Sequence, residues 1–270
     1  MNLFYREEGE GFPLVIIHGL YGSSDNWLTV GKKLSSRFKV YMIDQRNHGR
    51  SPNSQEFNYE VLKNDLADFF DQHNIEKAIL MGHSMGGKTA MSFAADYPER
   101  IEKLIVVDIA PKDYFLLKDE SQYFLHKNIL EAMLNIDFTR IESRKDVENY
   151  LLERIDSIPI VQFLLKSVNR NKNSKQFEWR LNAQVLYDNL DEVISGINAR
   201  WFDDRLPIFN YPVLFIKGAD SNYILPEDYQ SILHIYPEAI IRVIPNAGHW
   251  LHAEQPQLFM EVLEQFLKKY

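Results

Sequence analysis

Residues 78–87 read AILMGHSMGG, an apolar run that passes at once into small residues around Ser84. The apolar run is typical of a buried strand, and the residues after Ser84 are typical of a helix. A sharp turn between the two needs glycine on both sides, because a Cβ atom would collide with the strained backbone there. Gly82, Gly86 and Gly87 meet that need. The pattern predicts that Ser84 is a nucleophile lifted clear of the sheet, with a glycine-rich helix start of no catalytic role as the simpler alternative.

Similar apolar runs lie on both sides of this turn. A helix is expected over residues 85–97, ending before Pro98, and another is expected to begin at Pro256. Alternating strands and helices are typical of an α/β fold, in which a mostly parallel, doubly wound sheet carries helices on both faces. We predict further strands at residues 14–17, 40–43, 104–107, 213–216 and 240–244.

The strand and helix alternation stops after Pro111. Charged amphipathic stretches replace it, at residues 121–135, 145–155 and 183–197. We therefore expect an α/β core made of residues 1–111 and 206–270, with residues 112–205 inserted as a helical cap. Open α/β sheets bind ligands beyond the carboxyl ends of their strands, so the cap is expected to form part of the substrate pocket.

Composition narrows the class of function. The chain has 270 residues, a formal net charge of −8 and no cysteine. The negative charge disfavours a nucleic acid partner, and the lack of cysteine excludes disulfides, thiolate catalysis and cysteine-based zinc sites. No apolar stretch reaches the length of a signal peptide core or a membrane span, so a cytoplasmic protein is expected.

A second glycine-containing turn follows the run at residues 14–17. It reads His18-Gly19-Leu20-Tyr21-Gly22, and backbone N–H groups of such a turn can point into a cleft. The amide of Leu20, together with the amide of Met85 after the nucleophile, would form an oxyanion hole for acyl transfer. The alternative is a purely structural turn that His18 caps.

The general base is expected late in the chain, because this kind of fold orders its residues as nucleophile, acid and histidine. His249 lies in Asn246-Ala247-Gly248-His249-Trp250, between the last predicted strand and the last helix. Its neighbour His252 lies toward that helix and has the weaker claim. The remaining candidates are interpreted as structural or solvated, namely His73, His126 and His234.

Two aspartates could orient the histidine, and the residues alone leave the choice open. Asp108 directly follows the strand at 104–107, and Asp220 follows the strand at 213–216. Either carboxylate could fix the tautomer of His249 and stabilise the imidazolium that forms during catalysis. We prefer Asp108, because it ends its strand directly and precedes the cap; either aspartate could instead cap a turn.

Two further polar stretches are interpreted as structural and not as catalytic. Residues 44–51 read DQRNHGRS after the second strand and are interpreted as a structural loop held by its own side chains. In the cap, a local basic stretch is best explained as a solvated face, with docking of an anionic group such as the phosphates of an acyl-CoA as the alternative. Its members are Lys166, Arg170, Lys172, Lys175 and Arg180.

Taken together, these motifs resemble the α/β-hydrolase superfamily, and more narrowly the YbfF-like esterases and their relatives, the α/β-hydrolase domain-containing proteins of type eleven. The resemblance covers nearly the whole chain. It implies a helical cap, activity on short acyl esters and, as a further option, on acyl-CoA thioesters, and a pocket shaped by Trp250. Tyr21 and His83 are also expected to line the substrate pocket. Similar proteins often have asparagine where Asp220 stands, which supports Asp108 as the acid.

The expected function is that of a serine carboxylesterase or thioesterase, which cleaves a small-molecule ester through a Ser-His-Asp triad and an acyl-enzyme. No metal or organic cofactor is expected. A carbon–carbon bond hydrolase or a perhydrolase would use the same residues, and a non-catalytic ligand receptor is the alternative from a different class. The sequence leaves the oligomeric state open between monomer and dimer.

Overall fold

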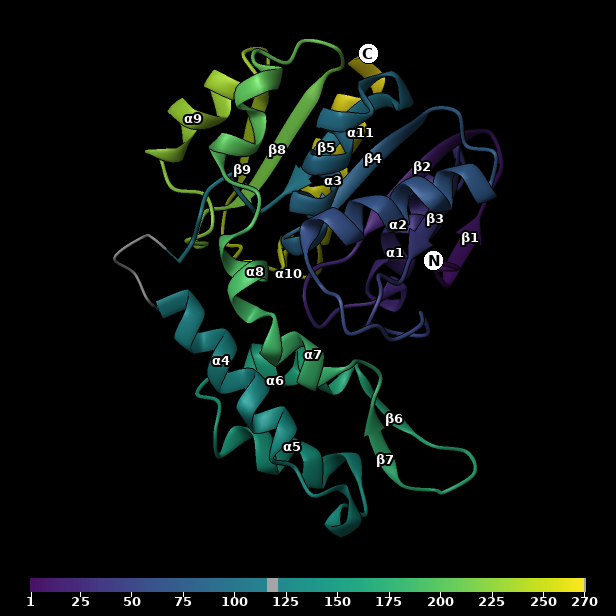
Figure 1. Cartoon of the computed structure of the whole chain (residues 1–270), viewed down its shortest axis with the longest axis vertical. Coiled ribbons are helices and arrows are strands. Elements are labelled where there is room, and N and C mark those ends of the chain that lie inside the picture. The colour runs from purple at the N-terminus through teal and green to yellow at the C-terminus, as the bar shows by residue number, and fades with distance from the viewer. Residues whose placement is uncertain (116–120, 270) are drawn as a thin grey trace.

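The computed structural model describes residues 1–115 and 121–269 and contains a seven-stranded sheet covered by helices (Figure 1). The strand order is β1-β3-β2-β4-β5-β8-β9, and every pairing is parallel except that of β1 with β3. The strands are β1 (Tyr5–Glu8), β2 (Phe12–Ile17), β3 (Phe38–Ile43), β4 (Ala78–His83), β5 (Ile101–Val107), β8 (Val213–Gly218) and β9 (Ile240–Ile244). The predicted α/β class with a mostly parallel sheet is confirmed.

Each of the six apolar runs forms a strand. Within the seven-stranded sheet, the strand that was not predicted is β1, which reads YREE and pairs with β3 at the edge of the sheet. An edge strand needs less apolar surface than a central one, because one side of it faces solvent. Its polar sequence therefore carried no strand signal.

Two apolar cores lie on opposite faces of the sheet. Side chains alternate between the faces along a strand, so Val15 and Ile17 of β2 enter one core while Leu14 and Ile16 enter the other. The first core includes helices α2 (Tyr59–Gln72), α3 (Met85–Asp96) and α9 (Asp228–Ile235), and the second includes α1 (Leu28–Leu34) and α11 (Pro256–Lys269). Burial on both faces explains why the central strands read as continuous apolar runs.

The chain changes direction across the sheet between β2 and β4. β2 has β3 on one side and β4 on the other, and Ile17 at the end of β2 pairs in register with Gly82 near the end of β4. The turns that follow these two strands therefore leave the same edge of the sheet side by side. Such a switch point is where open α/β sheets bind their ligands.

The segment between β5 and β8 forms a separate layer of helices below the sheet in Figure 1. It contains α4 (Ser121–Leu134), α5 (Arg144–Leu152), α6 (Ile158–Leu165), α7 (Ala183–Asp188) and α8 (Leu190–Ser195). It also carries a hairpin of β6 (Val168–Arg170) and β7 (Phe177–Trp179), which the sequence analysis did not predict. The predicted cap range of 112–205 also includes residues 116–120, which lie outside the described residues.

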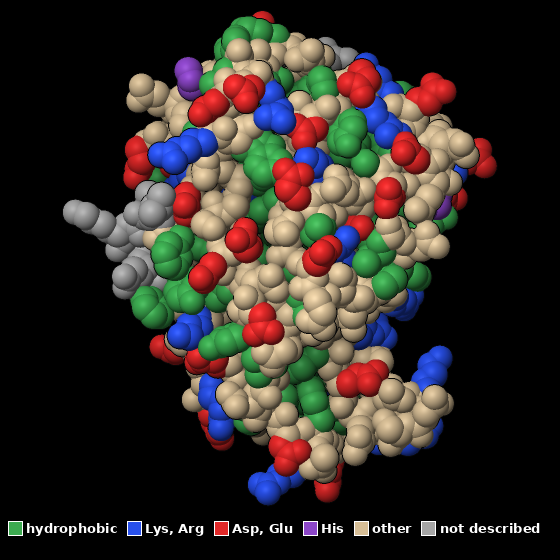
Figure 2. All heavy atoms as spheres, viewed as in Figure 1, with side chains coloured by type: hydrophobic (Ala, Val, Ile, Leu, Met, Phe, Trp, Pro, Cys, Tyr) green, Lys and Arg blue, Asp and Glu red, His purple; other side chains and the backbone are tan. Residues whose placement is uncertain are grey.

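Acidic and basic side chains are interspersed on the face shown in Figure 2. Within the described ranges, none of the helices combines the length and the apolar character needed to cross a lipid bilayer. Four short 3-10 helices complete the described elements, at Ser24–Trp27, Pro98–Arg100, Phe138–Arg140 and Ala199–Arg205, and α10 (Leu251–Glu254) precedes α11.

Candidate active site

Ser84 sits at a strained turn between β4 and α3. Its φ and ψ angles are 54° and −123°, a conformation that side chains with a Cβ atom rarely adopt. Glycine is required on both sides: a Cβ on Gly82 would lie 2.1 Å from the carbonyl oxygen of Gly86, and one on Gly86 would lie 2.5 Å from that of His18. The sequence therefore folds here in the way the glycine pattern predicts, and Ser84, although buried, lines a cavity.

The turn after β2 lies beside this serine. The Gly22 amide donates to the Gly19 carbonyl over 3.0 Å, and Tyr21 has a φ of 63°. Among the described residues, the backbone amides of Leu20 and Met85 donate to no other group. If Ser84 attacked a carbonyl group, two such amides beside it could bind the developing oxyanion.

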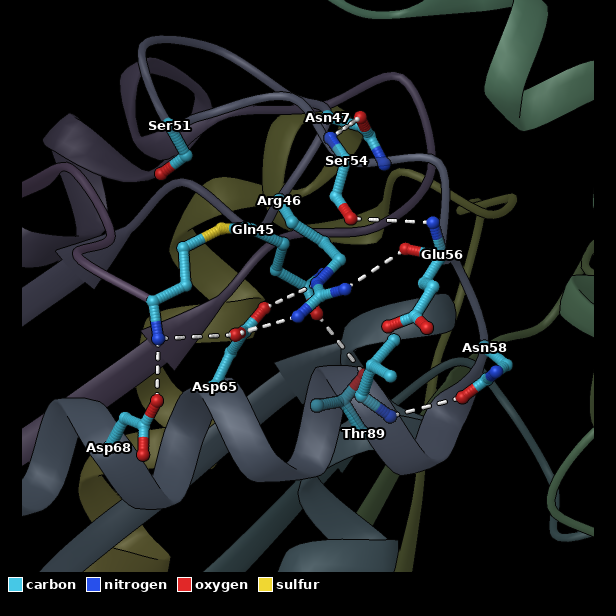
Figure 3. Close-up of polar contacts among 12 residues, drawn as sticks. Gln45, Arg46, Asn47, Ser51, Ser54, Glu56, Asn58, Asp65, Asp68 and Thr89 are labelled. Atoms are coloured by element: carbon cyan, nitrogen blue, oxygen red, sulfur yellow. Dashed lines mark hydrogen bonds and ion pairs between the residues drawn. The ribbon is translucent and has the colours of Figure 1, made fainter.

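His18 and Gln45 fix the shape of this turn. The Gln45 amide donates to His18 Nε2 over 2.9 Å, so Nδ1 carries the proton and donates to the Gly19 carbonyl over 2.7 Å. Burial lowers the pKa of His18 to about 4, which keeps the ring neutral. The Gln45 amide side chain donates to the His18 carbonyl over 2.8 Å and accepts from Thr89 of α3 over 3.1 Å (Figure 3). The turn is thereby tied to the helix that follows Ser84.

The loop at residues 44–51 is held by its own polar side chains, as its sequence suggests. Arg46 makes a two-pronged contact with Asp65 of α2, at 2.5 Å and 2.8 Å, and also donates to the Glu56 carbonyl over 3.0 Å (Figure 3). Both charged side chains are buried. The loop also contacts the cap segment, because the Asn182 amide donates to the Asn47 carbonyl over 2.9 Å.

His249 contacts Asp108 and not Asp220. His249 Nδ1 lies 2.7 Å from Asp108 Oδ2, and the Asp108 side chain is fully buried. The Gly218 amide donates to the other Asp108 oxygen over 3.0 Å, and the Ser221 hydroxyl donates to Oδ2. Asp220 is exposed. The structure therefore brings together His249 and the first of the two candidate acids.

Ser84 and His249 line the same cavity. The Ser84 hydroxyl makes no hydrogen bond with His249 or with another described residue. Contacts of this kind are often long in the absence of substrate and tighten when it binds.

The loop that carries His249 is anchored at several points. The carboxylate of Glu254 accepts from the amides on either side of the histidine, those of Gly248 at 2.6 Å and Trp250 at 3.1 Å. His83 Nε2 donates to the His249 carbonyl over 2.9 Å. The Tyr223 ring stacks on the imidazole, with 3.9 Å between ring centroids. The backbone and the ring of His249 are therefore both fixed.

His126 is half-buried and lies in the site, although no sequence motif surrounds it. It lies on α4, with Nδ1 3.1 Å from the Tyr21 hydroxyl and Nε2 3.0 Å from the Tyr223 hydroxyl. Burial lowers its pKa to about 4. Sequence reasoning also missed Ser221, Tyr223 and Glu254. Only their nearness to Asp220 and His249 along the chain could have indicated them, and for His126 the sequence carries no signal.

Two cavities meet at Ser84. The one that we call the Lys88 cavity has about 350 Å³ of empty space, part of it open to solvent, and is lined by Leu20, Tyr59, Ser84, Met85, Lys88, Ile109, Tyr114, Gln122, His126, Val193, Ile194 and Tyr223. The Trp250 cavity has a volume of about 630 Å³ and is lined by Leu20, Tyr21, His83, Ser84, Gln122, Leu125, His126, Ile129, Ile160, Phe163, Tyr223, His249 and Trp250. The three residues expected to shape the substrate pocket thus line the Trp250 cavity.

The basic residues of the cap segment do not converge. Arg170 lies over the Phe177 ring at 5.5 Å, and Arg180 donates to Asn169 over 2.9 Å and lies 3.6 Å from Asp25. Lys166 lines a different hollow next to Trp250. Within residues 1–115 and 121–269, no three histidine or acidic side chains gather in a way that could hold a metal ion.

Comparison with known proteins agrees with this geometry. A sequence model of the family described as alpha/beta hydrolase fold matches residues 13–256. The chain is 33% identical over 255 residues to esterase YbfF of Escherichia coli, covering 94% of this chain and 92% of that protein. It is 34% identical over 264 residues to the sn-1-specific diacylglycerol lipase ABHD11 of Danio rerio, covering 97% and 80%.

A solved structure agrees as well. The structure of a marine microorganism esterase is 41% identical to this chain, covers 98% of both chains and superposes with a TM-score of 0.89. The chain therefore belongs to the alpha/beta hydrolase fold family, in which it groups with carboxylic ester hydrolases.

Proposed function

We propose that the protein is a serine esterase that hydrolyses small-molecule carboxylic esters through an acyl-enzyme on Ser84. In this proposal His249 is the general base, Asp108 orients and stabilises it, and the amides of Leu20 and Met85 bind the oxyanion. Residues 112–205 act as a cap over the site.

One observation carries the proposal. The paired His249 and Asp108 side chains and the strained Ser84 all lie at the carboxyl edge of the sheet, next to two amides that have no other partner among the described residues. The cavities that meet at Ser84 provide room for an ester on both sides of it. The relatives named as esterases support the same reaction class.

The first half of the reaction, acylation, depends on which ring nitrogen of His249 carries the proton. Because Nδ1 faces a carboxylate that can only accept, the proton sits on Nδ1 and the lone pair of Nε2 is free for the Ser84 hydroxyl. As the Ser84 oxygen attacks the ester carbonyl, its proton passes to Nε2, and the carbonyl oxygen takes the negative charge. The two free amides stabilise that charge, an effect worth about 10²–10³ in turnover for each donor. The imidazolium then returns the proton to the departing alkoxide, and an alcohol leaves.

Deacylation repeats these steps with water as the nucleophile. His249 takes a proton from water as it attacks the acyl-enzyme, and the collapse of the second tetrahedral intermediate returns a proton to Ser84. The products are one carboxylic acid and one alcohol. Asp108 stays ionised throughout and stabilises the imidazolium formed in each half of the cycle.

Hydrolysis of p-nitrophenyl butyrate tests this function. The wild-type protein should hydrolyse many equivalents of the ester. Ser84→Ala should lose activity by about 10⁶-fold, or down to the rate of the uncatalysed reaction where that rate is higher. Thermal unfolding of both proteins controls for folding. Steady-state hydrolysis by Ser84→Ala at the wild-type rate would overturn the proposal. A wild-type protein that binds esters without turnover would instead indicate a receptor.

A further inference from the structure

The two cavities at Ser84 differ in which catalytic groups they contain. Both are lined by Leu20, Ser84 and Tyr223, so the two halves of an ester whose carbonyl group is held at Ser84 can extend into either cavity. His249 lines only the Trp250 cavity, and Met85 lines only the Lys88 cavity. The chemistry of acyl transfer can therefore assign one half of the ester to each cavity.

The leaving alkoxide must lie next to the imidazolium that protonates it, because proton transfer needs hydrogen-bond contact. Resting on the function proposed above, we infer that the alcohol half of the substrate occupies the Trp250 cavity and the acyl half occupies the Lys88 cavity. The acyl group then lies on the Met85 side of the scissile bond. This makes the larger cavity, about 630 Å³ against about 350 Å³, the alcohol site.

The Lys88 cavity suits a small, uncharged acyl group. Lys88 is buried, and its ammonium donates to the carbonyls of Lys112 at 3.0 Å, Ile194 at 3.2 Å and Gly196. All three of its protons are thereby used, so none remains for an acyl carboxylate. The Tyr59 and Tyr114 rings lie against the same ammonium, at 5.7 Å and 4.9 Å.

These contacts also fix the end of the Lys88 cavity. The three carbonyls come from the two ends of the segment between β5 and β8, at residue 112 and at residues 194–196 around the end of α8. Lengthening the cavity would break hydrogen bonds of a buried ammonium, which is costly. The acyl chain is therefore limited by a rigid wall.

The Trp250 cavity suits a bulky, uncharged and largely apolar alcohol. Its far wall consists of apolar side chains from α4 and α6, among them Leu125, Ile129 and Ile160. The Phe163 and Trp250 rings face each other across 5.0 Å. Within the described residues, no lysine, arginine, aspartate or glutamate lines this cavity. The substrate class is thus an ester of a small apolar acid with a larger apolar alcohol.

Two isomeric esters test this assignment, because hexyl acetate and ethyl hexanoate have the same atoms and reverse the two halves. In pH-stat assays, kcat/KM for hexyl acetate should exceed that for ethyl hexanoate by at least about tenfold, the cost of methylenes that a pocket cannot hold. An equal rate, or a preference for ethyl hexanoate, would overturn the assignment while leaving the esterase function intact. If the protein hydrolysed neither of the two isomers and also failed to hydrolyse ethyl acetate, that result would overturn the esterase function itself.

Two variants locate the halves. Ile160→Trp fills the Trp250 cavity and should lower the ratio of kcat/KM for hexyl acetate to that for ethyl acetate by about tenfold. Val193→Ala widens the Lys88 cavity and should raise the ratio of ethyl hexanoate to ethyl acetate. Ile158→Trp is the matched control, because Ile158 begins the same helix as Ile160 but is 66% exposed, and it should change neither ratio. An Ile160→Trp variant that instead lowers the ethyl hexanoate ratio would reverse the assignment.

Discussion

His249 Nδ1 lies 2.7 Å from Asp108 Oδ2, although 141 positions separate the two residues in the chain. Asp108 has a φ of 51°, and its carboxylate also accepts from the Gly218 amide and the Ser221 hydroxyl. A carboxylate held in place by these donors can hold one tautomer of the histidine. The predictions on catalysis follow from this contact.

The first prediction compares the two aspartates. Asp108→Asn should lower kcat by about 10⁴-fold, because an amide can hold the wrong tautomer of His249. Asp220→Asn is the matched control, since Asp220 is exposed, and it should remain close to wild type. Steady-state kinetics on p-nitrophenyl butyrate measure both. A large loss in Asp220→Asn with none in Asp108→Asn would show that the acid has been assigned to the wrong strand.

A second prediction concerns the hydroxyl that supports Asp108. Ser221→Ala should lower kcat/KM by about tenfold or more, because a hydrogen bond to a charged group contributes about 1.5–3 kcal/mol. Ser231→Ala serves as the control, since the Ser231 hydroxyl only donates to the Asp228 carbonyl on α9. Kinetics should be measured together with thermal unfolding. Unchanged activity in Ser221→Ala would mean that Asp108 does not depend on this donor.

Stability should depend strongly on the buried pair of Arg46 and Asp65. Arg46→Ala leaves a buried carboxylate without its partner and should lower the free energy of unfolding by about 3–5 kcal/mol. Glu102→Gln removes the exposed pair with Lys77 and should cost less than about 1 kcal/mol. Urea titration measures both changes. Similar small losses in the two variants would contradict the role of Arg46 in holding the loop.

The pH dependence of stability follows from four histidines whose pKa values are lowered by desolvation. Burial lowers the pKa of His18 and His126 to about 4 and that of His48 and His252 to about 3. In the unfolded chain these pKa values are about 6.5, so between about pH 6.5 and pH 4 the unfolded chain binds more protons. The free energy of unfolding should therefore be highest above about pH 6.5 and fall as the pH falls.

His252→Phe isolates one of these contributions. The His252 ring stacks on Trp27 at 4.2 Å, and in the described part of the chain its Nδ1 atom has no hydrogen-bond partner, so phenylalanine fits the contact without a titrating group. Between about pH 7.5 and about pH 5, the wild type should lose about 2 kcal/mol more stability than this variant. Urea unfolding at the two pH values measures the difference. Parallel losses in both proteins would contradict the lowered pKa of His252.

The central strands could be predicted because burial on both faces leaves an unbroken apolar run. The edge strand Tyr5–Glu8 and the hairpin around residues 168–179 carry no such run, and pairing with a neighbour determines them. The turn at Ser84 was predictable for a different reason. Its glycines are required by backbone collisions within a few residues, so the signal is local.

The choice between Asp108 and Asp220 could not be made from the sequence around each residue. Both aspartates follow strands, and only the paths of β5 and β8 determine which carboxylate reaches His249. The same holds for His126, whose contacts with Tyr21 and Tyr223 join residues about 100 positions apart. Contacts between distant segments leave no periodic pattern in the sequence.

The most direct test of the central claim is to trap the acyl group. Wild-type protein mixed with p-nitrophenyl acetate should be quenched in acid during the first turnovers, digested and examined by mass spectrometry. The account predicts an acetyl group on the Ser84 hydroxyl, and no acetylated peptide from Ser84→Ala. Steady turnover with Ser84 unmodified, or with the acetyl group on another residue whose substitution abolishes turnover, would contradict it.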